Sequence, residues 1–269
     1  MIKITLKPKF KIESEMNLKN LSNHGFDRKL ICKTKILYNN KEVAIDKIFE
    51  IKIDKNEEIQ NELVILDLNK NCDYLGWKWR DGVLRVKSNV GSFLGSEMVA
   101  GEILVDGSAE HFVGSQMCGG KIIIKSNVLD FAGSSLPGYK KGMSGGLIII
   151  NGNARDYLGF NIRRGILFVK GNVGNYSCNS MIAGTVILKK KVGNNLGFGM
   201  KRGTIFLNKK ISSLKNFTKI GEVKNSFFDL LNVYLTRKFG LKIFQKGESL
   251  IKYHGDESLD GTGEIIVKK

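Results

Sequence analysis

Apolar and polar residues alternate in short segments that recur at a fixed interval through the middle of this chain. In each segment a glycine is followed, two and four places later, by aliphatic residues. Because successive side chains of a strand point to opposite faces, both aliphatic positions lie on one face, which is the predicted core. These core pairs are Leu84/Val86, Ile103/Val105, Ile122/Ile124, Ile148/Ile150, Leu167/Val169, Val186/Leu188 and Ile205/Leu207.

Two columns of glycine fix this interval at 19 residues. The first column is Gly76, Gly95, Gly114, Gly133, Gly159 and Gly197, with Cys178 in the sixth of its seven places. The second column is Gly82, Gly101, Gly120, Gly146, Gly165, Gly184 and Gly203. One step is 26 residues long and holds a seven-residue insertion at 137–143. A 19-residue unit is too short for two packed helices but holds three short strands and three corners. The pattern therefore predicts an all-β protein, a right-handed parallel β-helix (a single-stranded solenoid) of about seven 19-residue coils.

Two further columns support coils stacked in register. Asparagines at one corner tolerate a left-handed backbone and can bond their equivalents along the stack. They are Asn89, Asn127, Asn153 and Asn172. Three places after the first glycine stand large residues, which we expect to fill the core rather than to bind a cofactor. They are Trp79, Met98, Met117, Leu136, Ile162, Met181 and Met200.

The flanks of the repeat have a different character and define three segments. Residues 1–66 contain the strand-like stretches MIKITLK, KTKILYNN and KIFEIKI, which predict a small β-rich cap. The repeat itself occupies 67–210. Residues 211–269 contain NSFFDLLNVYLTRKFG, a capped amphipathic helix, and GTGEIIVKK, a final strand. We expect the flanks to cover the two open ends of the stack, where unpaired strand edges would otherwise invite aggregation.

The position between the two core residues of each unit points outward, yet it is apolar in six of seven units. The first unit has Arg85, and the others have Leu104, Ile123, Ile149, Phe168, Ile187 and Phe206. A contiguous apolar stripe usually marks an interface. We therefore predict that the stripe is covered by a partner subunit. The alternative is that an N- or C-terminal segment of the same chain lies over it.

Basic residues gather at the corner before the second glycine. They are Arg80, Arg163, Arg164, Lys201 and Arg202, with Lys140 and Lys141 in the insertion. The simpler interpretation is a solvated charged edge. The alternative is an edge that binds a carboxylate-rich ligand or an acidic subunit.

Composition widens the choice of partners without deciding among them. The 269 residues include 43 Lys and Arg against 26 Asp and Glu, a formal net charge of +17. Such a charge suits nucleic acid, an acidic subunit or an anionic substrate, but no nucleic-acid-binding motif accompanies it. The chain shows neither an N-terminal signal peptide nor an apolar run of membrane-spanning length, so we expect a cytoplasmic protein without nucleic-acid or membrane partners.

Motifs for catalysis and metal binding are missing from the sequence. Three histidines lie in separate regions, and HExxH, GxSxG and GxxxxGK[ST] motifs do not occur. The four cysteines have no CxxC spacing and are predicted to be buried free thiols in a reducing cytoplasm. We expect this chain to bind no metal or cofactor and to have no catalytic residue of its own.

Several phrases of the sequence resemble a known family. VGSFLGSEMVAGEILVDG, FAGSSLPGYKKGMSGGLIIINGNARDYLG and the closing KYHGDESLDGTGEIIV are similar to the glycine-repeat subunit of formylmethanofuran dehydrogenase, which is related to the glycine-repeat domain at the C-terminus of glutamate synthase. The resemblance extends to LSNHGFDRKL near the N-terminus and so covers nearly the whole chain. Cys178, Ser88 and Ser126 depart from the family's glycine pattern at corners.

The resemblance implies a role within an enzyme complex. Formylmethanofuran dehydrogenase is an archaeal oxidoreductase that fixes CO2 onto methanofuran with reduced ferredoxin, the first step of methanogenesis. Its other subunits carry tungsto- or molybdopterin, iron–sulfur clusters and a metal pair, on formate-dehydrogenase-like and amidohydrolase-like chains. Those chains are the implied partners, and this chain is implied to be a structural subunit. Methanofuran has a glutamyl tail, which makes the basic corner a candidate contact for it.

Two other functions remain open on the same residues. A bacterial formyltransferase/hydrolase complex uses a similar subunit, and a free-standing glutamate-synthase-like solenoid domain would act as a spacer between amidotransferase chains. The insertion and the C-terminal phrase favour the dehydrogenase-type subunit. A basic nucleic-acid-binding solenoid would need interleaved aromatic and basic residues, which the repeat lacks.

Overall fold

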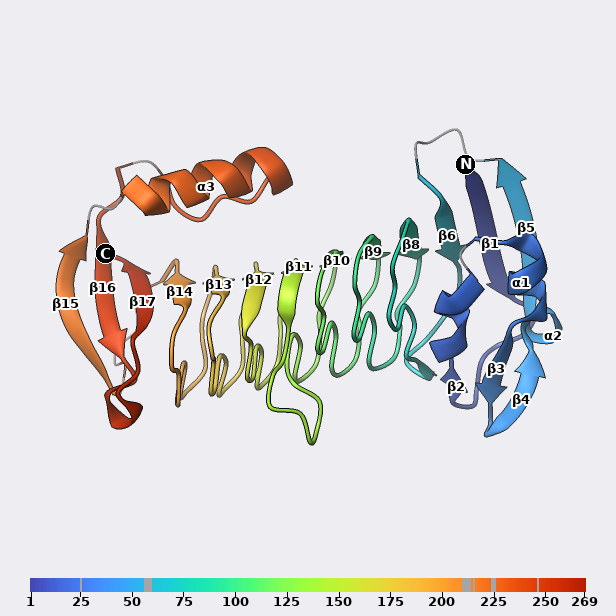
Figure 1. Cartoon of the computed structure of the whole chain (residues 1–269), viewed down its shortest axis with the longest axis horizontal. Helices are drawn as coiled ribbons and strands as arrows, with labels where there is room; N and C mark the ends of the chain where they lie inside the picture. The colour runs from blue at the N-terminus through green and yellow to red at the C-terminus, as the bar shows by residue number, and fades with distance from the viewer. Residues whose placement is uncertain (25, 56–59, 210–213, 215, 224–225, 246) are drawn as a thin grey trace.

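The computed structural model describes the chain except for residues 25, 56–59, 210–213, 215, 224–225 and 246. One sheet of 13 strands runs along the molecule, in the order β15-β16-β17-β14-β13-β12-β11-β10-β9-β8-β6-β1-β5. Neighbours from β6 to β14 and on to β17 pair in parallel. The predicted all-β class is confirmed as a mostly β protein with a large, mostly parallel sheet and few helices (Figure 1).

The repeat units contribute one strand each to this sheet. These strands are β8 (Val83–Val86), β9 (Glu102–Val105), β10 (Lys121–Ile124), β11 (Ser144–Ile150), β12 (Arg164–Val169), β13 (Thr185–Leu188) and β14 (Thr204–Leu207). Equivalent residues stand side by side, as Leu84 does with Ile103 and Ile103 with Ile122. No residue of the predicted core pairs is more than 1% exposed. The two aliphatic columns therefore form the core, as the alternation predicts.

A second line of contacts ties the units together away from the main sheet. Isolated parallel bridges link six small residues in succession, Val90, Ala109, Val128, Ala154, Val173 and Val192. Beside them, the side chain of Asn127 accepts a hydrogen bond from the backbone N–H of Asn153 at 2.8 Å, and Asn153 accepts one from Asn172 at 2.8 Å. The predicted bonding of the asparagine column along the stack is confirmed, with the backbone of the next unit as the partner, but none of the four asparagines has the left-handed backbone that was expected at this corner.

The large-residue column contains one error of alignment. Met143, fully buried, occupies the place that the sequence alignment gave to Leu136, which is only half-buried. Met143 stands three residues before Gly146, the spacing found in every other unit. A Cβ at Gly146 would lie 2.6 Å from Cε of Met117, so each of these methionines needs the bare glycine of the next unit. The extra residues therefore end at Gly142, before Met143.

The N-terminal segment extends the main sheet and adds a smaller one. β1 (Ile2–Pro8) pairs in parallel with β6 (Glu62–Ile65) and antiparallel with β5 (Phe49–Lys55). The smaller sheet has the order β4-β3-β2-β7. Its strands and the neighbouring helices are β2 (Met16–Asn17), η1 (Lys19–His24), α1 (Arg28–Lys33), β3 (Lys35–Tyr38), β4 (Lys41–Ala44), α2 (Ile45–Ile48) and β7 (Cys72–Asp73).

The C-terminal segment closes the other end of the sheet. β17 (Gly263–Lys268) pairs in parallel with β14, and β16 (Leu250–Gly255) and β15 (Phe217–Val223) follow in antiparallel order. A short η2 (Glu257–Leu259) precedes β17. The predicted helix is α3 (Ser226–Phe239), which ends at Gly240 with φ +67°. Among the described residues, no helix is both long enough and apolar enough to cross a membrane.

Candidate functional site

The C-terminal segment covers four of the six residues of the outward apolar stripe. Ile149, Phe168, Ile187 and Phe206 are at most 5% exposed, and they form one cluster with residues of α3 and the chain that follows it. The added residues are Phe228, Leu235, Leu241, Ile243, Phe244 and Leu250. The prediction that these four stripe residues touch a partner subunit is wrong, because α3 and the apolar residues that follow it, Leu241, Ile243, Phe244 and Leu250, already exclude solvent from them (Figure 1).

Hydrogen bonds hold the covering segment together and join it to the end of β13. Asn232 on α3 accepts a hydrogen bond from the N–H of Ile243 at 2.7 Å and donates one to the carbonyl of Phe244 at 2.9 Å. Lys189, at the end of β13, donates to the carbonyls of Lys242 and Ile243 at 3.1 and 2.7 Å. Burial lowers the pKa of Lys189. The C-terminal segment is therefore attached to the sheet by specific hydrogen bonds as well as by apolar packing.

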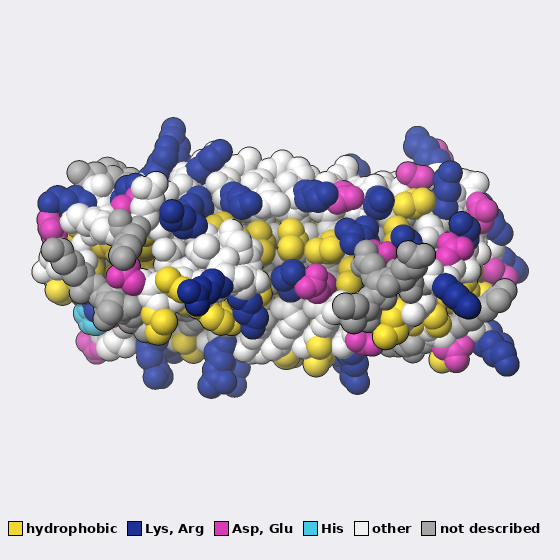
Figure 2. Space-filling model, turned by 90° about the horizontal axis from the view of Figure 1, so that it is seen from above, with side chains coloured by type: hydrophobic (Ala, Val, Ile, Leu, Met, Phe, Trp, Pro, Cys, Tyr) yellow, Lys and Arg dark blue, Asp and Glu magenta, His cyan; other side chains and the backbone are white. Residues whose placement is uncertain are grey.

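The other two residues of the stripe are not covered. Leu104 on β9 and Ile123 on β10 are half-buried, and Ile123 touches only the margin of the covered cluster. Figure 2 looks onto this side of the molecule and shows hydrophobic side chains gathered over the middle strands, with lysines and arginines around them. These two residues are what remains of the predicted interface.

The basic residues occupy one repeated corner of the units. We call the two residues before each second-column glycine the corner pair; the seven pairs are Arg80–Asp81, Val99–Ala100, Cys118–Gly119, Ser144–Gly145, Arg163–Arg164, Ile182–Ala183 and Lys201–Arg202. The backbone of every pair after the first is held by a hydrogen bond to the preceding unit. The N–H groups of Ile182 and Ala183 both donate to the carbonyl of Ile162, at 2.8 and 3.2 Å. The corner-pair side chains consequently form rows along the molecule.

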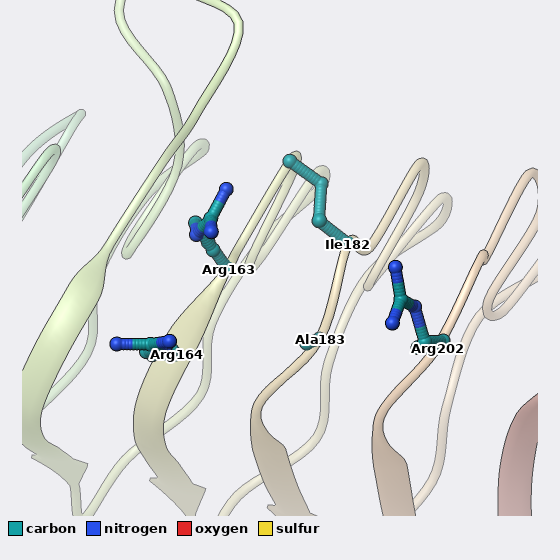
Figure 3. Close-up of a pocket in the computed structure, with 5 residues that line it drawn as sticks. All are labelled: Arg163, Arg164, Ile182, Ala183 and Arg202. Atoms are coloured by element: carbon teal, nitrogen blue, oxygen red, sulfur yellow. The ribbon is translucent and has the colours of Figure 1, made fainter.

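Three arginines of this row line one pocket. It has a volume of about 180 Å³ and is lined by Arg163, Arg164, Ile182, Ala183 and Arg202 (Figure 3). Arg163 and Arg202 belong to the units on either side of Ala183 (Figure 3). Two strand spacings separate their backbones, roughly 10 Å. The small side chain of Ala183 leaves the space between them.

The pocket has the electrostatics of an anion site. None of its three arginines forms an ion pair with an acidic residue in the described part of the chain, although lysines and arginines form twelve ion pairs with carboxylates elsewhere in it. Arg164 and Arg202 are exposed, and Arg163 is half-buried. A guanidinium presents a planar fork that matches a carboxylate, and it carries its charge at every physiological pH. The pocket can therefore bind carboxylates.

Four predicted basic residues lie outside this pocket, and Arg80, exposed in the first unit, is one of them. Lys140 and Lys141 are exposed in the insertion, whose loop projects from the row of units on the side opposite α3 (Figure 1). Lys201 is exposed beside Arg202 but does not line the pocket. The sequence identified the three arginines but missed Ile182 and Ala183, because a neutral corner pair shows no chemistry until its neighbours in the stack are known.

A stack of aromatic rings also runs along the repeat and was not predicted. Neighbouring rings lie 4.5 to 5.2 Å apart between centroids and within 7° of parallel. The stack consists of Tyr74, Phe93, Phe112, Phe131, Tyr157 and Tyr176. Each ring stands two residues before the first-column position, so the 19-residue alignment contained the signal. Every one of these residues has a left-handed backbone, with φ between 53° and 65°.

Other titratable groups form no second centre. Among the described residues, no three His, Cys, Asp or Glu side chains come together as metal ligands would. Cys72 and Cys178 are buried, and burial raises the pKa of both thiols, that of Cys72 to about 11. Cys32 and Cys118 are exposed, so the prediction of buried thiols is wrong for these two. His111 lies 3.3 Å from Asp130, at the surface.

Comparison with known proteins connects this geometry to a family. Residues 46–230 match a family model described as the GXGXG motif. A search of curated proteins finds no match to the chain. Among solved structures, the chain is similar to one in the X-ray crystal structure of the formyltransferase/hydrolase complex from Methylorubrum extorquens in complex with methylofuran. The TM-score is 0.87 at 28% sequence identity, and the match covers 98% of this chain and 99% of that chain. The resemblance inferred from the quoted phrases of the sequence is thereby confirmed.

Proposed function

This chain belongs to the GXGXG motif family, and on that premise we propose that it is a structural subunit of a complex that transfers one-carbon formyl groups on a methanofuran-type coenzyme. The observation that carries the proposal is the similarity over the full length of both chains, with a TM-score of 0.87, to a chain of a formyltransferase/hydrolase complex with methylofuran. The N-terminal cap, the insertion and the C-terminal cover all fall within the matched 98% of the chain. A free-standing spacer domain would not need all three.

The chemistry belongs to partner chains in this proposal. The described residues bring together no metal ligands, and the pocket offers only arginines, alanine and isoleucine. Those side chains bind and orient an anion; they supply no nucleophile and no general base. The subunit therefore holds other subunits and the charged part of the coenzyme.

The basic corner is the proposed contact for the glutamyl tail of that coenzyme. Arg163, Arg164 and Arg202 line the pocket, and Lys201, Lys140 and Lys141 extend the positive surface around it.

The uncovered part of the stripe, Leu104 and Ile123, is the proposed docking face for an amidohydrolase-like or formate-dehydrogenase-like subunit. The division into 1–66, 67–210 and 211–269, and the right-handed coiling of the repeat, belong to the same proposal. Right-handed crossovers are the rule between parallel strands.

Two activities fit such a subunit and one experiment separates them. Tagged chain is purified from its native host, the co-purifying chains are identified by mass spectrometry, and tungsten and molybdenum are measured. A formyltransferase chain without either metal favours the formyltransferase/hydrolase complex, to which the structural similarity points. A pterin-metal subunit with tungsten or molybdenum favours the formylmethanofuran dehydrogenase, the oxidoreductase that the sequence resembles. Recovery of a lone, stable monomer would refute both.

A further inference from the structure

Ala183 differs from every other small residue in the corner row. Ala100, Gly119 and Gly145 occupy the same second place of their corner pairs, but none of them has an arginine on both sides. Ala183 stands between Arg164 of the preceding unit and Arg202 of the following one. A small side chain bracketed by two guanidinium-bearing neighbours occurs at this one corner of the seven.

The pocket at this corner is chemically mixed. Its two sides are cationic, while its centre is formed by the Ile182 side chain and the Ala183 methyl group (Figure 3). A compact anion such as phosphate would satisfy one side and leave the apolar centre unused. A methylene chain with a carboxylate at each end would place its charges on the arginines and its apolar middle against Ile182 and Ala183.

From this arrangement we propose that Ala183 determines specificity: it admits the methylene segment of an aliphatic chain that carries carboxylates, and the flanking arginines bind the carboxylates. The inference rests on the proposed function only in taking the basic corner as an anion site. It adds the class of ligand and the residue that selects it. A larger side chain at position 183 fills the space while leaving all the charges in place.

The test uses the full-length chain and three small probes at low ionic strength, where screening is weakest. Pimelate has a carboxylate at each end of five methylene groups, heptanoate has the same carbon count with one carboxylate, and inorganic phosphate is a compact anion. Affinities are measured by chemical-shift titration. We expect pimelate to bind wild-type protein more tightly than heptanoate or phosphate does. Ala183→Leu should lower the affinity for pimelate about tenfold and leave the affinity for phosphate unchanged.

Two matched variants make the result interpretable. Ala100→Leu adds the same volume at a corner that has an arginine only in the preceding unit, Arg80, paired there with Asp81, and should bind all three probes like wild type. Ala183→Val, a smaller addition, should weaken pimelate less than Ala183→Leu does, and it serves in place of Ala183→Leu if circular dichroism shows that the leucine variant is misfolded. Wild-type affinity of the Ala183 variants for pimelate, or equal affinity of wild type for phosphate and pimelate, would overturn the inference.

A charge variant separates failure of this inference from failure of the basic corner itself. Arg163→Gln with Arg202→Gln removes one arginine from each side of the pocket, leaves Arg164 in place, and should weaken pimelate binding more than tenfold. If that variant loses pimelate while Ala183→Leu does not, the anion site stands and its selection by Ala183 is refuted. If the double arginine variant binds pimelate like wild type, the corner is a solvated edge and both proposals about it fail.

Discussion

The ring of Phe206 on β14 meets the ring of Phe228 on α3 nearly at right angles, with the ring centroids 5.4 Å apart. Phe206 belongs to the outward stripe and Phe228 to the C-terminal segment, so this contact joins the repeat to its own cover. An edge-to-face pair of buried phenylalanines is favourable beyond the area that it buries. The stripe therefore contributes to folding over β11 to β14 and is free for a partner only over β9 and β10.

Removing this contact should destabilise the chain itself. Phe206→Ala is expected to lower the free energy of unfolding by about 3–5 kcal/mol, since Phe206 is 1% exposed and its loss leaves a cavity under α3. Urea unfolding followed by circular dichroism measures the change. Phe198→Ala, at a phenylalanine that is 49% exposed, is the control and should cost far less. Equal, small effects of both substitutions would mean that α3 does not pack on the sheet in solution.

Charges placed under the cover should unfold it instead of blocking assembly. Phe168→Asp with Ile187→Asp puts two carboxylates into a closed apolar cluster, which strongly disfavours the native state. We expect the isolated double variant to lose its cooperative thermal transition. A wild-type transition, with loss of partner binding alone, would restore the prediction that these residues bind another subunit.

Charges at the two uncovered stripe residues, Leu104 and Ile123, should block assembly without unfolding the chain. Leu104→Asp with Ile123→Asp alters half-buried residues, so the isolated chain should keep its fold and its circular-dichroism spectrum. Assembly with partner chains should fail, because a charge in a dry interface has no partner. Co-purification from the native host measures it, with Leu259→Asp at an exposed leucine as the control. A normal complex from the Leu104/Ile123 variant would place the docking face elsewhere.

The aromatic stack should stabilise in proportion to the number of ring contacts. Phe112 stacks on two rings, each 5.0 Å away, while Tyr176 at the end stacks on one. At ~0.5–1.5 kcal/mol per pair, Phe112→Ala should cost about twice as much as Tyr176→Ala. Phe112→Asn should recover part of the loss, since φ is 61° there and asparagine tolerates this conformation. Thermal unfolding of the three variants checks the order, and equal costs would contradict stacking as the cause.

Glu62 should make the N-terminal end of the sheet sensitive to acid. It is 5% exposed, with Nε of Arg85 at 2.8 Å and Nζ of Lys3 at 3.3 Å. Burial acts to raise the pKa of Glu62, but the hydrogen bonds from Arg85 and Lys3 outweigh it, and the pKa lies below its ordinary value. A carboxyl whose pKa is lowered by folding stabilises the native state above its unfolded pKa. That contribution disappears as the pH falls through the folded pKa.

The measurement is the free energy of unfolding against pH. Between about pH 6 and pH 3, wild type should lose more stability than Glu62→Gln, which has no carboxyl to protonate. Glu13→Gln, at a carboxylate that is 73% exposed in its pair with Lys11, should leave the wild-type slope intact. If Glu62→Gln shows the full wild-type slope, the acid sensitivity arises at another carboxyl.

The repeat was predictable from sequence because each unit restates the same positions. Leu84 and Ile103 need the same environment 19 residues apart, so neither neighbour in the stack has to be known in advance. Leu136 was misplaced because the insertion offers two apolar candidates, Leu136 and Met143, for a single core position. The cover was unpredictable in another way: α3 has no repeat partner, and its apolar face could have packed on any apolar surface.

The pocket shows the same limit at the candidate site. The sequence displays Arg163, Arg164 and Arg202 as charges on separate units. Only the stacking of corners puts Ala183 between them and turns a charged edge into a concave one. The geometry of a site built across repeats depends on which units are neighbours. The seven-residue insertion shows that a sequence alignment of the units can assign a position to the wrong residue.

The central claim is that this chain contributes binding of the coenzyme, and no chemistry, to its complex. The most direct measurement is steady-state kinetics of the assembled complex with Arg163, Arg164, Lys201 and Arg202 all changed to Ser. Contacts of ~0.2–1 kcal/mol at each of these four cations predict a KM for the coenzyme raised at least about fourfold, more so at low salt, with kcat near wild type. An unchanged KM, or a fall in kcat at saturating coenzyme, would contradict the account.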